Sequence, residues 1–418
     1  MRNILEKVLL SIKPDAGEEE EIKRESLEFI SKLNGILKKL RIKAKIVIGG
    51  SFAKQTTIKK DKYDVDMFVV FEKKYKSEEI SDLLEKALRR INAKFTKLPG
   101  SRDYFNIGFK KFRAEIVPVT YIKKASEAKN ITDVSMLHVN YVKNKILKNK
   151  KLSDDIRLAK AICYANNCYG AESHIKGLSG YCLEILTIYY KGFFNLVKNA
   201  AKWKDKVIID PEKHYKKKNV LLELNEAKLL SPLILIDPIQ PNRNAAAALS
   251  KEKFDVFTDI CRKFVKKQSE KFFEKKKTDE RKIIENAKKG RLSLYMINAV
   301  SLKKKEDISG AKLLKLFNLL SEKLKKEGYA SKAEWDFKEK EARMWFSIKK
   351  IDKIMRAGPF IDMKKHLINF KKKYKKCTIK NKRIYAFISP KPLNEIFSID
   401  KKQLSDMGID EYKFRKIV

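Results

Sequence analysis

A glycine-rich turn between two apolar segments constrains this chain more than any other feature. Residues 49–56 read GGSFAKQT, follow the β-branched run of residues 46–48 and precede a second apolar run at residues 65–71. This pattern predicts a strand on each side of the turn. Glycines let backbone N–H groups approach a triphosphate closely, and the residues after Ser51 can open a helix whose N-terminus favours anions. The segment therefore predicts a phosphate-binding turn within a mixed α/β unit.

Carboxylates occur next to this turn and again further along the chain. Asp64 and Asp66 begin the second predicted strand and share one face of it, because side chains alternate along a strand. Two carboxylates on one edge repel unless a cation lies between them, and such hard oxygen ligands suit Mg²⁺. Glu115 interrupts the apolar run of residues 113–119, in which Pro118 suits a strand end or a sheet edge. We interpret the three carboxylates as metal ligands, with a solvated strand face and a salt bridge from Glu115 to a lysine as the alternatives.

The charge of the chain indicates its partner. Over 418 residues it carries 96 Lys and Arg against 53 Asp and Glu, for a formal net charge of +43. A charge of this size repels itself unless a polyanion neutralises it, which points to nucleic acid. Lysine enrichment of the kind found in thermophile proteins is the alternative. The apolar fraction of 43% is that of a globular protein.

Other classes of protein are disfavoured by what the sequence lacks. No window reaches the roughly 18 uninterrupted apolar residues of a membrane span, and the N-terminus has no signal-peptide core, so we expect a cytosolic protein. The five cysteines show no zinc spacing, and the four histidines form no His-x-x-x-His pair. A zinc enzyme is therefore not expected, and the cysteines are interpreted as reduced thiols.

The pattern changes along the chain. A helix is predicted at about 20–40, a mixed α/β unit continues to about 120, and the pattern is helical from about 130. Three further helices are predicted, at residues 154–166, at residues 180–200 with an almost all-round apolar surface, and at residues 245–250. The last third mixes helices with strands such as 342–348. It includes residues 371–376, KKKYKK, which suit either an RNA-contacting surface or a solvated charge run.

With these motifs in place, the chain resembles the polymerase-beta-type nucleotidyltransferase superfamily. It is similar in particular to the archaeal, class I CCA-adding tRNA nucleotidyltransferases. The segments that carry this resemblance are residues 160–172, 176–181 and 197–203, Asp237-Pro238 with Arg243-Asn244, and, more loosely, residues 356–359. The resemblance covers most of the chain in order and is most specific in the first 250 residues.

The resemblance implies an α+β protein with three domains. These are a catalytic nucleotidyltransferase domain at 1–132, a central helical domain for nucleotide and base recognition at 133–254, and a C-terminal tRNA-binding body and tail at 255–418. It also implies stepwise addition of C, C and A to the 3′ end of immature tRNA from CTP and ATP, with release of pyrophosphate and without a nucleic-acid template. The expected partners are tRNA, ATP and CTP, with no membrane, in the cytoplasm. A homodimer stays open.

Site residues follow from the resemblance position by position. Asp64, Asp66 and Glu115 fall where the family has its catalytic carboxylates, which would bind two Mg²⁺ ions. The residues that match nucleotide-binding positions are Gly50, Ser51 and Lys54 for the triphosphate, Lys160 and Tyr169 for its β/γ-phosphates, His138, and Arg243 for the base edge. The spacing of Lys160 and Tyr169 places them on or near one helical segment. A core role for Tyr169 and a satisfied buried histidine at 138 are the alternatives.

The sequence departs from the family pattern at two places, which keeps other functions open. Most relatives have Asp where this chain has Glu115, and the C-terminus from residue 386 to 418 is shorter than the family's tail. A poly(A) or oligoadenylate-type nucleotidyltransferase shares the glycine turn and the Asp-x-Asp pair but needs only ATP. The other alternative is a catalytically degenerate RNA-binding relative, suggested only by Glu115.

Overall fold

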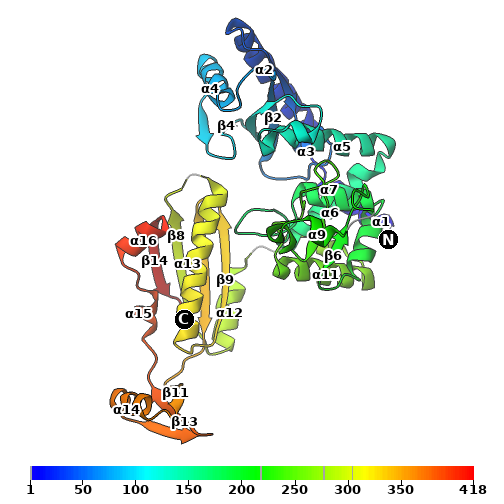
Figure 1. Cartoon of the computed structure of the whole chain (residues 1–418). Helices are drawn as coiled ribbons and strands as arrows, with labels where there is room; N and C mark the ends of the chain where they lie inside the picture. Colours follow the sequence, from blue (N-terminus) through cyan, green and yellow to red (C-terminus); the bar gives the residue numbers. More distant parts are fainter. Residues whose placement is uncertain (1, 217–218, 276–277, 304) are drawn as a thin grey trace. The chain divides into compact units, whose positions relative to one another are not determined.

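The structure is a computed structural model of the whole chain. The chain separates into two compact units, residues 1–276 and 277–418 (Figure 1). Each unit has sheets and hydrophobic cores of its own. The structure describes residues 2–216, 219–275, 278–303 and 305–418.

A five-stranded sheet in the order β1-β2-β5-β4-β3 organises the first 134 residues. Its strands are β1 (Ala44–Ile48), β2 (Tyr63–Phe71), β3 (Phe95–Leu98), β4 (Tyr104–Gly108) and β5 (Phe112–Thr120). The two central strands, β2 and β5, run parallel, and all other neighbours are antiparallel. Helices α2 (Ala16–Lys39) and α4 (Ile80–Arg90) pack on one face, which confirms the predicted helix and both strands that flank the glycine turn.

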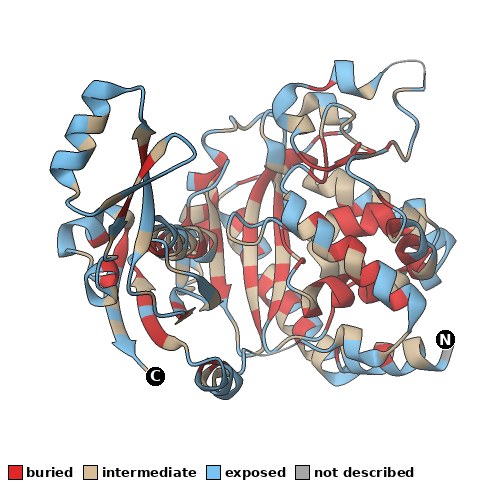
Figure 2. Ribbon diagram, turned by 90° about the horizontal axis from the view of Figure 1, so that it is seen from below, coloured by how far each residue is buried: buried red, intermediate tan, exposed pale blue. Residues whose placement is uncertain are grey.

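Alternation along β2 gives the sheet two different faces. Val65 and Met67 are fully buried against α2 and α4, whereas Asp64 and Asp66 lie on the opposite face and are only partly buried. Figure 2 shows such alternation as red and tan bands along the strands. Pro118 lies within β5 rather than at its end, but β4 pairs with β5 only as far as Ile116. At Pro118 the strand therefore has a neighbour on one side alone, as a residue without an N–H group requires.

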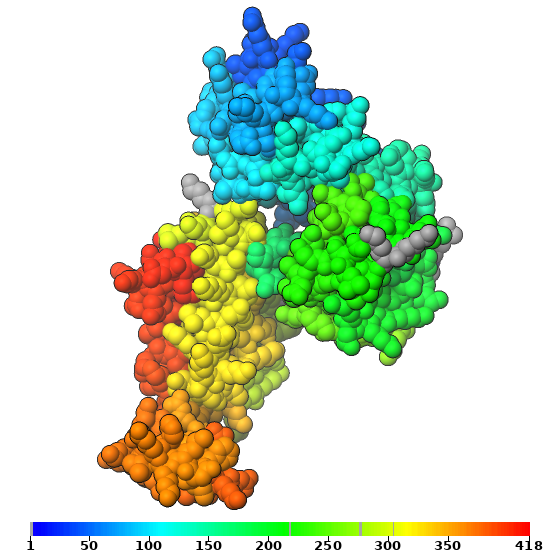
Figure 3. Space-filling model, in the orientation of Figure 1, coloured from blue at the N-terminus to red at the C-terminus, as the bar shows by residue number. Residues whose placement is uncertain are grey.

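Helices form most of the remainder of the first unit and enclose an apolar core. Figure 3 shows the surface of this helical part largely in green. The longer ones are α1 (Arg2–Ile12), α5 (Ser135–Lys148), α6 (Lys151–Ala165), α7 (Gly180–Tyr189), α8 (Phe193–Ala200) and α11 (Lys251–Lys266). The shorter elements are α3 (Gly50–Ala53), α9 (Val220–Glu223), α10 (Glu226–Leu229), the parallel pair β6 (Val207–Ile209) and β7 (Leu233–Leu235), and 3₁₀ turns at Ala125–Glu127, Ile131–Val134 and Glu270–Phe273.

Two helix predictions in this region are wrong. The predicted helix of residues 180–200 is two helices, because Lys191 and Gly192 have φ of +58° and +134°, which end α7 before α8 begins. Residues 245–250 form turns, since the Asn244 side chain accepts from Ala246 N at 2.9 Å. The next helix, α11, begins only after Ser250, whose hydroxyl caps it by accepting from Lys253 N.

The second unit holds two sheets. A four-stranded sheet in the order β14-β8-β10-β9 packs against α13, and a three-stranded sheet in the order β11-β13-β12 contacts α14. The elements are α12 (Glu280–Lys289), β8 (Ser293–Ser301), α13 (Glu306–Lys326), β9 (Ser331–Lys338), β10 (Glu341–Ile348), β11 (Ile354–Phe360), α14 (Lys364–Lys373), β12 (Cys377–Lys380), β13 (Arg383–Ile388), α15 (Leu393–Phe397), α16 (Lys401–Met407) and β14 (Ile409–Lys416). The predicted strand at 342–348 is confirmed as β10, and the α+β class is confirmed.

Packing between helices bears on where the chain divides. Helix α11 buries Phe254, Phe257 and Phe264 against helices that precede it, including α8, so it belongs to the first unit. The three-domain division with a boundary at 254/255 stays a prediction.

All five cysteines are free, as expected. None of the helices in the described part of the chain has the length and apolarity that crossing a membrane would take.

Candidate active site

The glycine turn lies directly against one carboxylate of β2. Gly49 donates its backbone N–H to the Asp66 carbonyl oxygen at 2.8 Å. Gly50 has φ of +59°, and a Cβ atom there would overlap the Asp66 carboxylate. Position 50 therefore requires glycine, because an L side chain would be strained at this φ and would have no room beside Asp66. The sequence thus brings the turn and the Asp-x-Asp pair into contact.

The three predicted carboxylates lie on one face of the central strands. Asp66 is the register partner of Glu115, and Asp64 is the partner of Arg113. Burial raises the pKa of Asp66 to about 6, with a further rise from the nearby Asp64 carboxylate, although Lys54 opposes both. A cation that approached Asp66 would stabilise the ionised form of its carboxylate.

The side chains of these carboxylates do not converge. Asp64 accepts from Arg113 Nη2 at 2.8 Å and from Lys60 Nζ at 3.5 Å. Within the described ranges, no three His, Cys, Asp or Glu side chains are close enough together to hold a metal ion. The strand register and the chemistry of the donors fit Mg²⁺, and Asp64 would have to leave Arg113 to join them.

A buried ion cluster lies behind the glycine turn. Glu184 on α7 binds Lys54 Nζ through Oε2 at 2.6 Å and Lys160 Nζ through Oε1 at 2.7 Å. Lys160 also donates to Thr56 Oγ1 at 2.9 Å and to the Thr56 carbonyl oxygen at 3.3 Å. The exposed fractions of Glu184, Lys160 and Lys54 are 1%, 2% and 8%. All three N–H donors of the Lys160 ammonium are therefore used inside the protein.

Two cations share one carboxylate in this Glu184 cluster, which shifts the pKa values of its members. Although burial opposes it, attraction to Lys160 and Lys54 lowers the pKa of Glu184 to about 2. Burial lowers the pKa of Lys160 to about 8, because Glu184 compensates the ammonium only in part and Lys54 repels it. The cluster as a whole keeps one positive charge beside the turn.

Helix α6 holds the segment that follows the turn. Arg157 Nε donates to the Thr57 carbonyl oxygen at 3.0 Å, one helical turn before Lys160 binds Thr56. Thr57 in turn donates its hydroxyl to Ser51 Oγ at 3.2 Å. Lys160 and Arg157 thus fix the backbone between the glycine turn and β2 from the helical side.

A second cluster gathers around Asp237, which is fully buried. Its Oδ2 lies 2.6 Å from Arg243 Nη1 and 3.1 Å from His138 Nε2, and its Oδ1 accepts from Tyr181 Oη at 3.2 Å. Despite the cost of burial, His138, a backbone N–H and Arg243 lower the pKa of Asp237 to about 2. The His138 and Tyr181 rings lie 4.4 Å apart between centroids, tilted by 32°. The cluster thus contains two aromatic rings and the Arg243 guanidinium, which the ionised Asp237 carboxylate holds in place.

Helix α7 connects the two clusters. Tyr181 and Glu184 stand one turn apart on it, and Ser179 caps its N-terminus by accepting from Cys182 N. A Cβ atom at Gly180 would lie 3.0 Å from Tyr169 Oη and 3.6 Å from Lys160 Cε, so Gly180 leaves room for both side chains. Tyr169 lies just beyond the helix that carries Lys160, because α6 ends at Ala165 and Tyr169 bridges to Leu178. The two residues are thus near one helical segment, but only Lys160 lies on it.

The predicted nucleotide-binding residues therefore fall into two groups with different partners. Lys54, Lys160 and Tyr169 belong to the Glu184 side of α7, and His138 and Arg243 to the Asp237 side. Sequence reasoning missed Glu184 and Tyr181 as site residues, although a single carboxylate in an almost wholly apolar helix is a clear signal, since a buried charge needs partners. Arg157 left no such signal, because one arginine in a polar helix face is ordinary.

Comparison with known proteins identifies two matched regions of the first unit. The family model described as "Nucleotidyltransferase domain" matches residues 30–162, and the one described as "tRNA nucleotidyltransferase, second domain" matches residues 154–274. Among solved structures, the Cid1 poly(U) polymerase with bound Mg 3′-dATP superposes with a TM-score of 0.53 at 13% identity over 66% of this chain and 98% of that one, which shows a shared fold. The first unit thus contains a nucleotidyltransferase domain.

Curated relatives define the family more closely. The CCA-adding enzyme of Nanoarchaeum equitans is 37% identical over 360 residues, 85% of each chain. That of Methanocaldococcus jannaschii is 29% identical over 400 residues, 93% of this chain and 87% of its own. This chain belongs to the archaeal CCA-adding enzymes, as its motifs had indicated.

Proposed function

We propose that this protein completes the 3′ end of tRNA by adding C, C and A from CTP and ATP, with release of pyrophosphate and without a nucleic-acid template. Its membership of the CCA-adding enzymes supports the reaction. The observation that carries the proposal is the pairing of the Gly49-Gly50 turn with the face of β2 and β5 that bears Asp64, Asp66 and Glu115. A triphosphate on the turn would then have its α-phosphate beside carboxylates.

Asp64, Asp66 and Glu115 would hold Mg²⁺, and the resemblance implies two ions. When bound, Mg²⁺ lowers the pKa of an attacking hydroxyl and neutralises charge on phosphate oxygens. The protein's own contribution is to place the carboxylates on neighbouring strands and to keep Asp66 against the turn. Glu115 is one methylene longer than the Asp that the family resemblance implies at this position, and the strand would have to accommodate the extra length.

The triphosphate would meet the turn and the charge behind it. Gly50 and Ser51 would offer backbone and hydroxyl donors, and the net positive Glu184 cluster lies next to them. Lys160 would bind a phosphate oxygen only by giving up a contact to Glu184 or Thr56. Lys54 donates one hydrogen bond in the described part of the chain, to Glu184, and could direct its other N–H groups to a phosphate. A lysine of this cluster that makes no direct contact with the triphosphate would still attract it electrostatically, and this attraction is strong in a poorly solvated site. Tyr169 would add a hydroxyl donor on the same side.

The base would be read at the Asp237 cluster. Arg243 offers fixed N–H donors that suit the acceptors of cytosine, and adenine would need a different arrangement. Asp237 orients the guanidinium through its 2.6 Å contact, and the His138 and Tyr181 rings offer an apolar wall. A charged hydrogen bond of this kind is worth about 1.5–3 kcal/mol.

Product length on one RNA tests the proposal against its alternatives. A tRNA that ends at its discriminator base would be incubated with CTP alone, ATP alone and both. We expect two added residues with CTP alone and three with both nucleotides. Long products from ATP alone, on any RNA, would identify a poly(A)-type enzyme instead. No incorporation with Mg²⁺ would leave only the RNA-binding alternative.

The base-reading role has its own test. Arg243→Ala should change the ratio of kcat/KM for CTP and ATP, whereas Lys160→Ala should lower both together. Arg90→Ala, at an exposed arginine on α4, is the matched control and should change neither. Equal effects of Arg243→Ala and Lys160→Ala on the two nucleotides would refute the assignment.

A further inference from the structure

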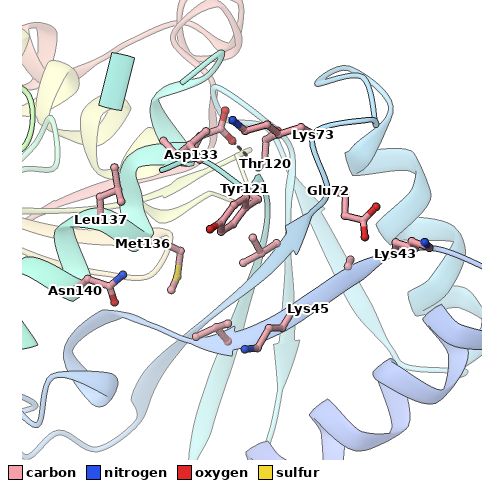
Figure 4. A pocket seen from close by; sticks show the side chains of 14 residues that line it. Lys43, Lys45, Glu72, Lys73, Thr120, Tyr121, Asp133, Met136, Leu137 and Asn140 are labelled. Atoms are coloured by element: carbon pink, nitrogen blue, oxygen red, sulfur yellow. Dashed lines mark hydrogen bonds between the residues drawn. The ribbon is translucent and has the colours of Figure 1, made fainter. Parts of the chain in front are cut away.

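A cavity of about 540 Å³ opens in the first unit beside the edge strand β1 (Figure 4). Val47 of β1 and Val70 of β2 line it. They belong to the sheet face that bears Asp66, because Val70 follows Asp66 by four residues and Val47 pairs with Phe68 between them. The cavity thus lies further along the same face as the carboxylates, past the glycine turn.

Its walls are mostly apolar and include one accessible aromatic ring. Met136 and Leu137 of α5 form one wall, opposite the strands. Tyr121, which follows β5, is 49% exposed, and Figure 4 shows its ring between α5 and the strands. A half-exposed ring over an apolar floor is a surface on which a flat group can stack.

The charged groups at the rim differ in whether they are already paired. Lys73 binds Glu127 at 2.6 Å, and Asp133 binds Arg102 at 2.6 Å. Glu72, which also lines the cavity, binds Lys74 at 3.4 Å. Lys43, directly before β1, and Lys45, on β1, are exposed, and in the described part of the chain neither ammonium has a hydrogen bond or an acidic partner. Two cations that are two residues apart therefore face solvent at the edge of an apolar cavity.

We propose that this cavity binds one nucleotide, with the base against Tyr121 and the phosphate at Lys43 and Lys45. The Asn140 amide on α5 also lines the cavity and offers a donor and an acceptor to a base edge. Aromatic stacking combined with basic groups is how proteins hold unpaired nucleotides. The volume admits a single nucleotide and no duplex.

This site is separate from the one proposed for the incoming CTP or ATP. Met136 and Asn140 are four residues apart and share one face of α5, whereas His138 lies between them on the opposite face, against Tyr181. A ligand in the cavity and a base at the Asp237 cluster would lie on opposite sides of one helix. The inference therefore goes beyond CCA addition itself.

Photolabelling of the full-length protein tests it. The probe is 8-azido-AMP, applied with saturating CTP so that the nucleotide site near Arg243 is occupied, and the adducts are mapped by peptide mass spectrometry. We expect an adduct on residues that line the cavity, such as Tyr121. An adduct confined to residues near His138 and Arg243, or one that CTP abolishes, would overturn the proposal.

Variants and competitors complete the experiment. Lys43→Glu with Lys45→Glu, and separately Tyr121→Ala, should each reduce cavity labelling at least about tenfold, while the control Lys39→Glu at an exposed position of α2 should not. Unchanged labelling in both variants would refute the site. A free nucleotide and a residue of an RNA strand share this chemistry. Competition by unlabelled AMP, or by a tRNA that already ends in CCA, tells which of the two occupies the cavity.

Discussion

Glu184 is the residue with the largest influence on the site among those that the sequence analysis missed. It neutralises one of two buried lysines and so decides how much positive charge remains behind the glycine turn. Asp237 likewise forms an ion pair with Arg243 and lies 3.1 Å from His138 Nε2. In both clusters, residues predicted from the family pattern surround a buried carboxylate and contact it.

Replacement of either strand carboxylate should abolish addition. Asp64→Ala and Asp66→Ala each remove an oxygen ligand from the proposed metal site, so we expect turnover to fall by several orders of magnitude while the far-ultraviolet circular dichroism stays unchanged. Asp61→Ala, at an exposed position just before β2, is the control and should keep full activity. Near-normal Mg²⁺-dependent turnover of either variant would show that the metal assignment is mistaken.

The stability of the Glu184 cluster should depend on pH in a defined direction. Glu184→Gln leaves two buried ammonium groups without their carboxylate, which should cost about 3–5 kcal/mol of unfolding free energy at pH 7. The folded-state pKa of Glu184, about 2, is below the ordinary value of 4.5, so its contribution is present above pH 4.5 and lost as the pH falls towards 2.

Urea unfolding at several pH values measures this effect. The free energies of unfolding of wild type and Glu184→Gln should differ most near neutral pH and converge as the pH approaches 2. Glu28→Gln, at an exposed glutamate of α2, serves as the control and should follow the wild type. A difference that stays constant from pH 7 to pH 3 would mean that Glu184 acts by packing and not by charge.

For whole elements, sequence periodicity predicted best where one face alone is buried. β1, β2, β5, β10 and α2 lie where alternation or helical spacing placed them. The errors occurred where a local backbone feature overrode composition. The apolar run of residues 180–200 gave no warning of the break at Gly192, and the alanines after Asn244 favoured a helix that the Asn244 side chain replaces with turns.

The glycine turn offers a test of whether its backbone is needed. Gly50→Ala would bring a Cβ atom into the Asp66 carboxylate at a φ of +59°, so both nucleotide addition and stability should fall. Gly35→Ala is the matched control, because a Cβ atom there meets nothing within 4 Å inside helix α2. That change should stabilise the protein by about 0.5–1 kcal/mol. Full activity of Gly50→Ala would contradict the placement of the turn against Asp66.

In the whole molecule, charge and composition indicated the partner, but they could not locate the boundary between units. Residues 277–418 carry 38 Lys and Arg against 18 Asp and Glu, a denser excess than in the first unit. The packing of α11 into the first unit depends on contacts far apart in the sequence, such as Phe193 with Phe264. No local pattern records those contacts, which is why only the structure could assign α11 to the helices before it.

Truncation after residue 275 should therefore separate two binding functions. The shortened chain keeps both cores of the first unit and all proposed nucleotide ligands, so CTP binding should survive. Binding of tRNA should weaken strongly, because the basic second unit is gone. A cut at residue 255 is the control: it removes most of α11, with Phe257 and Phe264, from the core and should unfold the helical part. Loss of CTP binding after the cut at 275, with the fold intact, would place a nucleotide ligand in the second unit.

Salt dependence should then show whether the charge of +43 is a binding surface. For full-length protein, the logarithm of tRNA affinity should fall with the logarithm of salt concentration by about 0.7 to 0.9 per phosphate contact, because each contact releases condensed counterions. Comparison between about 50 and 200 mM salt should give a steep slope for the whole chain and a shallow one for the chain cut after residue 275. Sodium sulfate at matched ionic strength controls for effects of a particular anion. If full-length affinity were insensitive to salt, the lysines would reflect composition alone, and recognition of tRNA would have to rest on the first unit.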